Sequence, residues 1–297
     1  MAEPEARPDG VGEVELPGLA LYRRGKVRDT FDLGERLLMV STDRISAFDT
    51  VLPTLIPDRG RVLTAMSRYW FRATSDLVPN HLLEDDVPEL PKAAWERIRG
   101  RSMLVAKADR IDIECVVRDR LAGSGWQEYR ESGTLAGEPL PRGLAFGAEL
   151  PELRFTPATK NDHGHDENIS RARLAELVGA ELARRLEDFS LRLFRLAQVH
   201  CQESGFVLVD SKFEFGMIAG ALILIDELLT PDSSRLWDLA QVGSETPHGF
   251  DKQPVRDYLL ATGWDRNPPA PELPPELVEE TRRRYLEASR RITGSAL

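Results

Sequence analysis

The alternation of apolar and polar residues predicts an α+β chain that begins with strands. Short apolar or alternating stretches indicate strands in the first part of the chain. These stretches are residues 19–22, 26–31, 36–41, 103–106 and 113–117. Val62, Met66 and Tyr69 recur at helical spacing, so we expect a helix over 61–75 that packs on the sheet.

The patterning becomes less regular in the second half of the chain. Residues 132–165 are rich in Gly, Pro and charged residues without sustained periodicity, which predicts a long loop that is either functional or disordered. Helical periodicity then predicts two helices, one containing Leu174 and Val178 and the next running from about Leu186 until Gly205 ends it. A last amphipathic helix is expected after Pro274.

A polar hairpin is predicted after these helices. Asp210, Lys212 and Glu214 alternate with other residue types, so in a strand they share one face. Residues 221–225 are wholly apolar and predict a buried strand, and Asp226 follows directly. A buried carboxylate at that position needs a cation.

The register of the hairpin decides what the two carboxylates do. A three-residue turn pairs Glu214 with Asp226, whereas a two-residue turn pairs Glu214 with Ile225. We expect the first arrangement, which suits Mg²⁺ because this ion combines one or two carboxylates with phosphate oxygens and water. The alternative is that Lys212 neutralises Glu214 on a solvated face.

Composition and charge narrow the class of protein. The chain has 297 residues, 41% of them hydrophobic and 30% charged, with a net charge of −10. This charge argues against nonspecific nucleic-acid binding. No stretch approaches the roughly 18 apolar residues of a membrane span, and the first ten residues do not resemble a signal peptide, so we expect a cytoplasmic protein. Cys115 and Cys201 lack metal-ligand spacing and are expected to be buried free thiols.

We expect a flexible tail and two domains. The tail covers residues 1–18, the β-rich nucleotide-cradle domain 19–112, and the α+β domain 113–297, with the seam at 107–112. The sequence has no internal repeat. It does not indicate the oligomeric state.

Three polar motifs are candidates for phosphate binding. Lys26 and Arg28 share a strand face and are suited to flank phosphates, although an exposed basic strand edge has the same pattern. Arg44 and Ser46 leave an apolar strand and offer donors to a carboxylate or phosphate, with local turn formation as the alternative.

The third motif combines Arg118 with the small-residue turn that contains Ser124. Its backbone N–H groups are suited to a phosphate, and a tight turn beside a surface arginine is the alternative. His163 and His165 are only two histidines in a loop, so we favour a solvated loop over a metal site.

Together these motifs resemble the SAICAR synthetase (phosphoribosylaminoimidazole-succinocarboxamide synthase) family, in its longer form. The motifs that carry the resemblance occur in order between about Leu21 and Leu260. They are GKVRD, STDRISAFD, ECVVRDRLAGSG, TKNDHGHDENIS, LVDSKFEFG, IDELLTPDSSR and FDKQPVRDYL.

The resemblance implies an ATP- and Mg²⁺-dependent ligase. Such an enzyme joins L-aspartate to the carboxylate of carboxyaminoimidazole ribonucleotide (CAIR) through an acyl phosphate, in purine biosynthesis. The implied fold is a two-part α+β structure related to kinase-like and ATP-grasp folds, with antiparallel sheets and ATP in the cleft between the parts. The implied partners are these small molecules, without nucleic acid or membrane.

The resemblance also implies roles for individual residues. Lys26, Lys212 and Asp162 would be catalytic. The binding residues would be Lys26, Arg28, Lys107 and Glu114 for ATP; Arg44, Ser46, Arg118, Ser124, Asp232 and Arg235 for CAIR; Lys160 and Asp162 for aspartate; and Glu214 and Asp226 for Mg²⁺. Either Asp162 or Asp49 would accept the proton of the aspartate amine.

Two other functions share part of this pattern. Another ATP-dependent carboxylate–amine ligase or small-molecule kinase needs the same ATP and Mg²⁺ residues, but it does not need a second phosphate site at Arg118, Ser124 and Arg235. A noncatalytic nucleotide-binding regulator predicts ATP binding without turnover.

Overall fold

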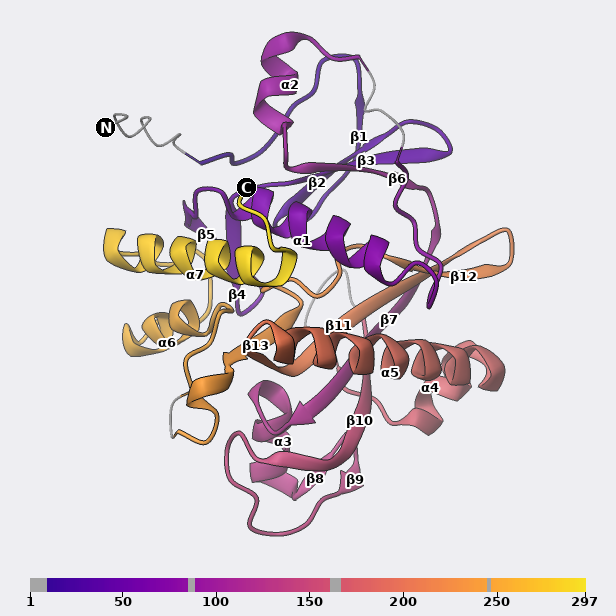
Figure 1. Ribbon diagram of the computed structural model, residues 1–297, viewed down its shortest axis with the longest axis vertical. Helices are drawn as coiled ribbons and strands as arrows, with labels where there is room; N and C mark the ends of the chain where they lie inside the picture. The colour runs from indigo at the N-terminus through magenta and orange to yellow at the C-terminus, as the bar shows by residue number, and fades with distance from the viewer. Residues whose placement is uncertain (1–9, 85–88, 161–166, 245–246) are drawn as a thin grey trace. The chain divides into compact units, whose positions relative to one another are not determined.

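The computed structural model describes residues 10–84, 89–160, 167–244 and 247–297. Its fold is α+β, as predicted (Figure 1). The chain divides into two compact units. The first unit comprises Met1–Tyr69, His81–Lys107 and Phe250–Leu297; the second comprises Trp70–Asn80 and Ala108–Gly249. No helix in the described ranges is long and apolar enough to cross a membrane.

The first unit contains an antiparallel sheet with the order β1-β2-β3-β6. Its strands are β1 (Ala20–Arg24), β2 (Arg28–Asp32), β3 (Arg36–Ser41) and β6 (Ser102–Ala106). The helix α2 (Lys92–Ile98) adds Ile98 to a core with Phe31, Leu38 and Val40. These strands confirm that the chain begins with a sheet, with β3 at the predicted bounds. The expectation that Lys26 and Arg28 share a strand face was wrong, because β2 begins only at Arg28 and Lys26 lies in the loop before it.

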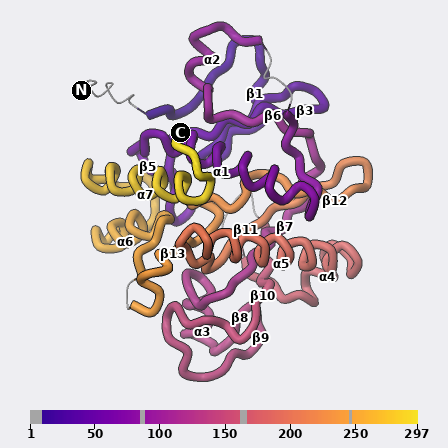
Figure 2. Tube along the Cα trace, in the orientation of Figure 1, coloured from indigo at the N-terminus to yellow at the C-terminus, as the bar shows by residue number. Residues whose placement is uncertain are grey.

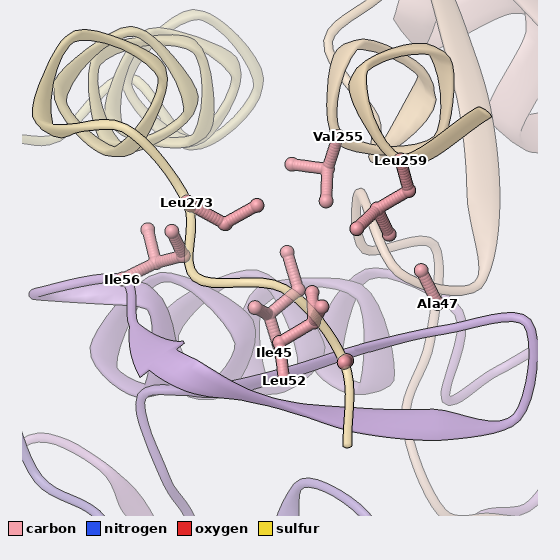
Figure 3. Packing of buried hydrophobic residues seen from close by; sticks show 8 residues of the cluster. Ile45, Ala47, Leu52, Ile56, Val255, Leu259 and Leu273 are labelled. Atoms are coloured by element: carbon pink, nitrogen blue, oxygen red, sulfur yellow. The ribbon is translucent and has the colours of Figure 1, made fainter. Parts of the chain in front are cut away.

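A second core in the first unit joins segments that are far apart in sequence. The hairpin β4 (Arg44–Ala47) and β5 (Thr50–Leu55) packs on α6 (Gln253–Ala261) and on the segment before α7 (Pro275–Thr293). Figures 2 and 3 show the end of the chain returning to this hairpin, where Val255, Leu259 and Leu273 meet Ile45 and Leu52. The residues from Phe250 onward therefore belong to the first unit, whereas the sequence grouped them with 113–249.

The helix α1 (Arg59–Ala73) confirms the helix expected over 61–75. Its first turn lies close to β3, since a Cβ at Gly60 would be 2.2 Å from the carbonyl oxygen of Ser41. Asp43 accepts hydrogen bonds from the N–H of Gly60 at 2.8 Å and from Arg101 at 2.9 Å. The start of α1 is thus held against the strand end that carries Asp43.

The second unit is built on an antiparallel sheet with the order β10-β7-β11-β12, and β13 also pairs with β11. Its strands are β7 (Asp109–Arg120), β10 (Glu149–Thr159), β11 (Phe206–Ile218), β12 (Ala221–Ile225) and β13 (Ser234–Asp238). The long helix α5 (Ala180–Glu203) contacts the apolar face of β11 through Phe189 and Phe215, whose rings lie 6.4 Å apart.

Shorter elements complete the second unit. They are α3 (Gly123–Ser132), β8 (Thr134–Leu135), β9 (Glu138–Pro139), α4 (Arg171–Val178) and the 3₁₀ helix η1 (Leu239–Gln241). The helices α4 and α5 confirm the helical periodicity seen in the sequence. Cys115 and Cys201 are buried free thiols, as predicted, and burial raises the pKa of Cys201 to about 12.

The prediction of a continuous loop over 132–165 was wrong, because this region contains β10. Pro151 and Pro157 obscured the strand pattern. β10 lies at the end of the strand order, where proline is tolerated since only one side of the strand needs its N–H groups. Pro151 also falls where the register with β7 shifts, between Glu149 and Arg154.

The expected register of the β11–β12 hairpin was also wrong. Glu214 pairs with Ile225, and Ile218 pairs with Ala221, so the turn has only two residues. Ala219 and Gly220 both have positive φ, +48° and +81°. A two-residue turn with this handedness matches the twist of the flanking strands, which explains why it replaces the three-residue turn.

We expect Ala219→Asn to stabilise the protein by about 0.5–1 kcal/mol, because asparagine adopts positive φ more readily than alanine. The change in the free energy of unfolding can be measured by urea denaturation. Ala221→Asn is the matched control: the same substitution at the first residue of β12 should bring no gain. Equal effects of the two substitutions would contradict the turn geometry.

Candidate functional site

Charged side chains from three adjacent strands meet on the polar face of β11. The Nζ atom of Lys212 lies 2.6 Å from Oε1 of Glu114 on β7 and 3.1 Å from Oε1 of Glu214. Lys160, just after β10, donates to the other oxygen of Glu214. Glu114 and Glu214 are partners across the strands and are only 9% and 4% exposed. Lys212 therefore separates two buried carboxylates that would otherwise repel one another.

The lysine and carboxylate groups of this cluster shift one another's pKa values, and these shifts determine which groups are charged. Burial alone would raise the pKa of Glu214, but Lys212 and Lys160 outweigh burial and hold this pKa well below its usual range. Burial would likewise lower the pKa of Lys212, yet Glu214, Glu114 and Asp226 raise it well above its usual value. The cluster therefore keeps Lys212 as an ammonium group and Glu214 as a carboxylate at neutral pH.

The predicted metal ligands Glu214 and Asp226 both lie near Lys212. Asp226 follows β12 directly, has a φ of +71° and contributes to the field at Lys212. Two carboxylates form a hard-oxygen donor set of the size that Mg²⁺ uses beside phosphate and water. Within the described residues there is no group of three or more acidic, His or Cys side chains that could hold a metal by itself. Glu214 pairs with Ile225, so the two carboxylates are not cross-strand partners as expected, although their number suits an ion that also binds phosphate and water.

A second cluster on the same sheet gathers two guanidinium groups around one carboxylate. Oδ2 of Asp210 on β11 accepts from Nη1 of Arg118 at 3.0 Å and from Nη1 of Arg235 at 2.5 Å. Arg118 also donates to Ser124 and to Thr156, both at 3.0 Å. Burial lowers the pKa of Arg118, and the neighbouring charge of Asp210 opposes that shift.

The N-terminus of α3 lies at this cluster. Its first residue, Gly123, has a φ of +52°, and a Cβ there would lie 2.2 Å from Nη2 of Arg235. Only glycine leaves room for the guanidinium group in this position. The N-cap residue Ala122 has no side-chain cap, so the helix start, Ser124 and the arginines together suit an anion such as phosphate.

The remaining residues predicted for ATP lie in the first unit. Lys26 is exposed and forms an ion pair with Asp49, the residue considered as a base. Lys107 donates to Asp32 at 2.8 Å and lies 4.7 Å from the centre of the Tyr22 ring. Its hydrogen bond to Asp32 raises the pKa of Lys107. Arg28 begins β2 and is half-buried.

Three further predicted residues have defined surroundings. Arg44 is buried and donates to Asp29 and to backbone oxygen atoms, so its guanidinium group is committed within the first unit. Ser46 is half-buried in β4. Asp232 is half-buried in a turn ordered by Thr230, which accepts from its N–H at 3.2 Å. Asp162, His163 and His165 lie outside the described residues.

Asp210, Thr156 and Gly123 were not predicted as members of the candidate site. The alternation of Asp210 with Lys212 and Glu214 was a signal, since all three share a face, but their partners were not evident. Gly123 stands in a small-residue turn, where the need for glycine is visible only from the position of Arg235.

Comparison with known proteins gives consistent relationships over nearly the whole chain. The sequence profile of SAICAR synthetase matches residues 21–271. The phosphoribosylaminoimidazole-succinocarboxamide synthase of Syntrophobacter fumaroxidans is 49% identical over 296 residues, covering 98% of each chain. That of Pelobacter propionicus is 49% identical, covering 97% of this chain and 99% of its own. The structure of SAICAR synthase from Saccharomyces cerevisiae complexed with SAICAR is 39% identical with a TM-score of 0.86, covering 97% of this chain and 99% of that one.

We expect Lys212→Met to lower the free energy of unfolding by roughly 3 kcal/mol, because Glu114 and Glu214 would lose the cation between them. Urea denaturation at neutral pH measures this change. Lys107→Met is the matched control, since Lys107 and its partner Asp32 are each about one-third exposed and their ion pair should add little stability. Similar losses in both variants would contradict a buried, charge-balanced cluster.

Proposed function

Because the chain belongs to the SAICAR synthetase family, we propose that it uses ATP to join L-aspartate to the carboxylate of CAIR, forming SAICAR, ADP and phosphate. This reaction is a ligase step of purine biosynthesis. We also propose that it takes place in the cytoplasm. The single structural observation that carries the proposal is the pair of guanidinium groups of Arg118 and Arg235 beside the start of α3.

In this proposal, Arg118, Arg235 and Ser124 bind the phosphate of CAIR. The two arginines converge on the carboxylate of Asp210, and Arg118 also contacts Ser124, so guanidinium and hydroxyl donors suited to an anion lie together. The N–H groups at the start of α3 add partial positive charge. The yeast protein that was solved with SAICAR, which carries such a ribonucleotide phosphate, is 39% identical to this chain and supports the assignment.

We assign the ATP phosphates to Lys26 and Arg28, with Lys107 and Glu114 as further ATP-binding residues. Glu214 and Asp226 would hold Mg²⁺, which supplies charge neutralisation for phosphoryl transfer when it is bound. Lys160 and Lys212 each donate to one oxygen atom of Glu214, so a metal ion at this carboxylate would share it with these ammonium groups.

The chemistry explains why cations are needed at this sheet. A carboxylate resists attack by an amine, so the CAIR carboxylate first attacks the terminal phosphorus of ATP and releases ADP. The aspartate nitrogen then attacks the acyl carbon, and phosphate leaves as the C–N bond forms. Lys212 is held as an ammonium group by its carboxylate neighbours and is suited to stabilise the negative charge on the transferring phosphoryl group.

Aspartate binding is assigned to Lys160 and Asp162. Lys160 lies beside Glu214, so a change in the contacts of this carboxylate would leave an ammonium group available to a substrate carboxylate. The aspartate amine must lose a proton before it attacks. Asp162 and Asp49 remain the two candidates for the base. Of these, only Asp49 lies within the described residues, and it forms an ion pair with Lys26.

The reaction can be tested by ADP release from the purified protein with ATP, Mg²⁺ and L-aspartate, with and without CAIR. We expect turnover only when CAIR and aspartate are both present, and we expect EDTA to abolish it. ADP release that needs CAIR but not aspartate would indicate a kinase. ATP binding without CAIR-dependent turnover would contradict the proposed function.

We expect Gly123→Ala to raise the KM for CAIR by at least about tenfold, because the added methyl group displaces Arg235. The KM for ATP should change little. Gly133→Ala is the matched control at the other end of α3: it also places alanine at positive φ, +73°, but nothing lies within 4 Å of its Cβ. Equal KM values for CAIR in the two variants would remove Arg235 from the phosphate site.

A further inference from the structure

The loop between β1 and β2 has its three carbonyl groups bonded from inside the first unit. This loop, residues 25–27, carries the exposed Lys26. Arg44 donates from Nη2 to the carbonyl oxygen of Gly25 at 3.0 Å and from Nε to that of Lys26 at 3.1 Å. Thr42 donates from Oγ1 to the carbonyl oxygen of Val27 at 2.8 Å and from its backbone N–H at 3.0 Å. Thr42 and Arg44, two residues apart in sequence, therefore hold all three carbonyl groups of the loop.

Arg44 is itself fixed by a buried carboxylate. Asp29, which is fully buried, accepts from Nη2 of Arg44 at 2.8 Å and from Nη1 at 3.3 Å. The same carboxylate accepts from the backbone N–H of Val14 at 2.7 Å. Arg44 is 7% exposed and uses its planar, forked donors on three different acceptor groups. It is therefore built into the first unit and is poorly placed to bind CAIR directly, the role that the family resemblance implied.

The inward carbonyl groups determine where the amide groups of the loop point. In a planar trans peptide, the C=O and the following N–H point in opposite directions. Inward carbonyls at Gly25 and Lys26 therefore turn the N–H groups of Lys26 and Val27 outward. Among the described residues, neither N–H has a protein acceptor. Successive outward N–H groups beside an ammonium side chain are suited to bind an anion.

We infer that Arg44 is a positioning residue for ATP: it holds the carbonyl groups of Gly25 and Lys26 inward, so that the N–H groups of Lys26 and Val27 bind phosphate oxygens together with the Lys26 side chain. This inference rests on the proposed assignment of Lys26 to the ATP phosphates. Thr42 assists by holding the carbonyl of Val27. The ligand class of the loop is a polyphosphate, and Arg44 itself does not touch it.

The test compares Arg44→Lys with Arg101→Lys in the full-length protein. Lysine keeps the positive charge beside Asp29 but lacks the fork that reaches the two carbonyl groups. Arg101 is equally buried, at 6% exposure, and pairs with Asp43, so its substitution controls for the loss of a buried guanidinium group. Calorimetry gives the Kd values for ATP and for inorganic tripolyphosphate, and thermal unfolding reports stability. Lys26→Met, measured in parallel, tests the underlying assignment.

We expect Arg44→Lys to weaken binding of both ATP and tripolyphosphate by about tenfold or more relative to Arg101→Lys, at similar loss of stability. Lys26→Met should weaken both ligands as well. If Lys26→Met weakens binding but Arg44→Lys binds ATP as tightly as Arg101→Lys, the positioning role of Arg44 is wrong. If Lys26→Met binds ATP like the unmodified protein, the assignment of the loop to ATP is wrong.

If Arg44→Lys does not fold, two less disruptive variants test the same inference. Thr42→Val removes the hydroxyl that holds the carbonyl of Val27, and Thr74→Val removes a comparable buried hydroxyl that donates to the carbonyl of Trp70 at 2.8 Å. We expect only Thr42→Val to weaken tripolyphosphate binding, by roughly threefold. Equal binding by both variants would overturn the inference.

Discussion

A strand can bury alternating charges only when its neighbours supply the opposite charges. β11 meets this constraint at each charged position: Asp210 lies between two guanidinium groups, and Lys212 lies between two carboxylates. The apolar face of the strand, packed on α5, holds the charged face in place. Because an unpartnered buried charge costs several kcal/mol, the substrate sites and the stability of this sheet depend on the same contacts.

The sequence pattern predicted the helices and strands whose apolar residues recur regularly. It missed features that depend on neighbouring strands or on backbone angles. The helix α1 and strand β3 follow from spacing alone, since their apolar residues recur at the helical and strand periods. β10 was missed because two prolines and several charges interrupt it, and only its edge position makes them acceptable. The register of the hairpin depended on the φ values of Ala219 and Gly220, which no periodicity reveals.

The candidate site was predicted as a set of residue types, but the pairing within it was not. Arg118 and Asp210 are 92 positions apart in sequence, so nothing local indicates that they share a hydrogen bond. Arg44 shows the same difficulty, because an arginine in a polar motif suits either a ligand or the backbone of a distant loop. Its contacts with Gly25 and Lys26 favour the second. Burial and geometry, rather than residue type, separate these two uses of a guanidinium group.

The return of Phe250–Leu297 to the first unit has a consequence for synthesis on the ribosome. The hairpin of β4 and β5 is made early, yet the residues that cover Ile45 and Leu52, among them Val255 and Leu259, are made last. Until then, this apolar surface has no native cover. The second unit, whose residues are all made before Phe250, can complete its core first. In a nascent chain of this protein, the second unit can therefore fold before the first, whose core needs residues from both ends of the chain.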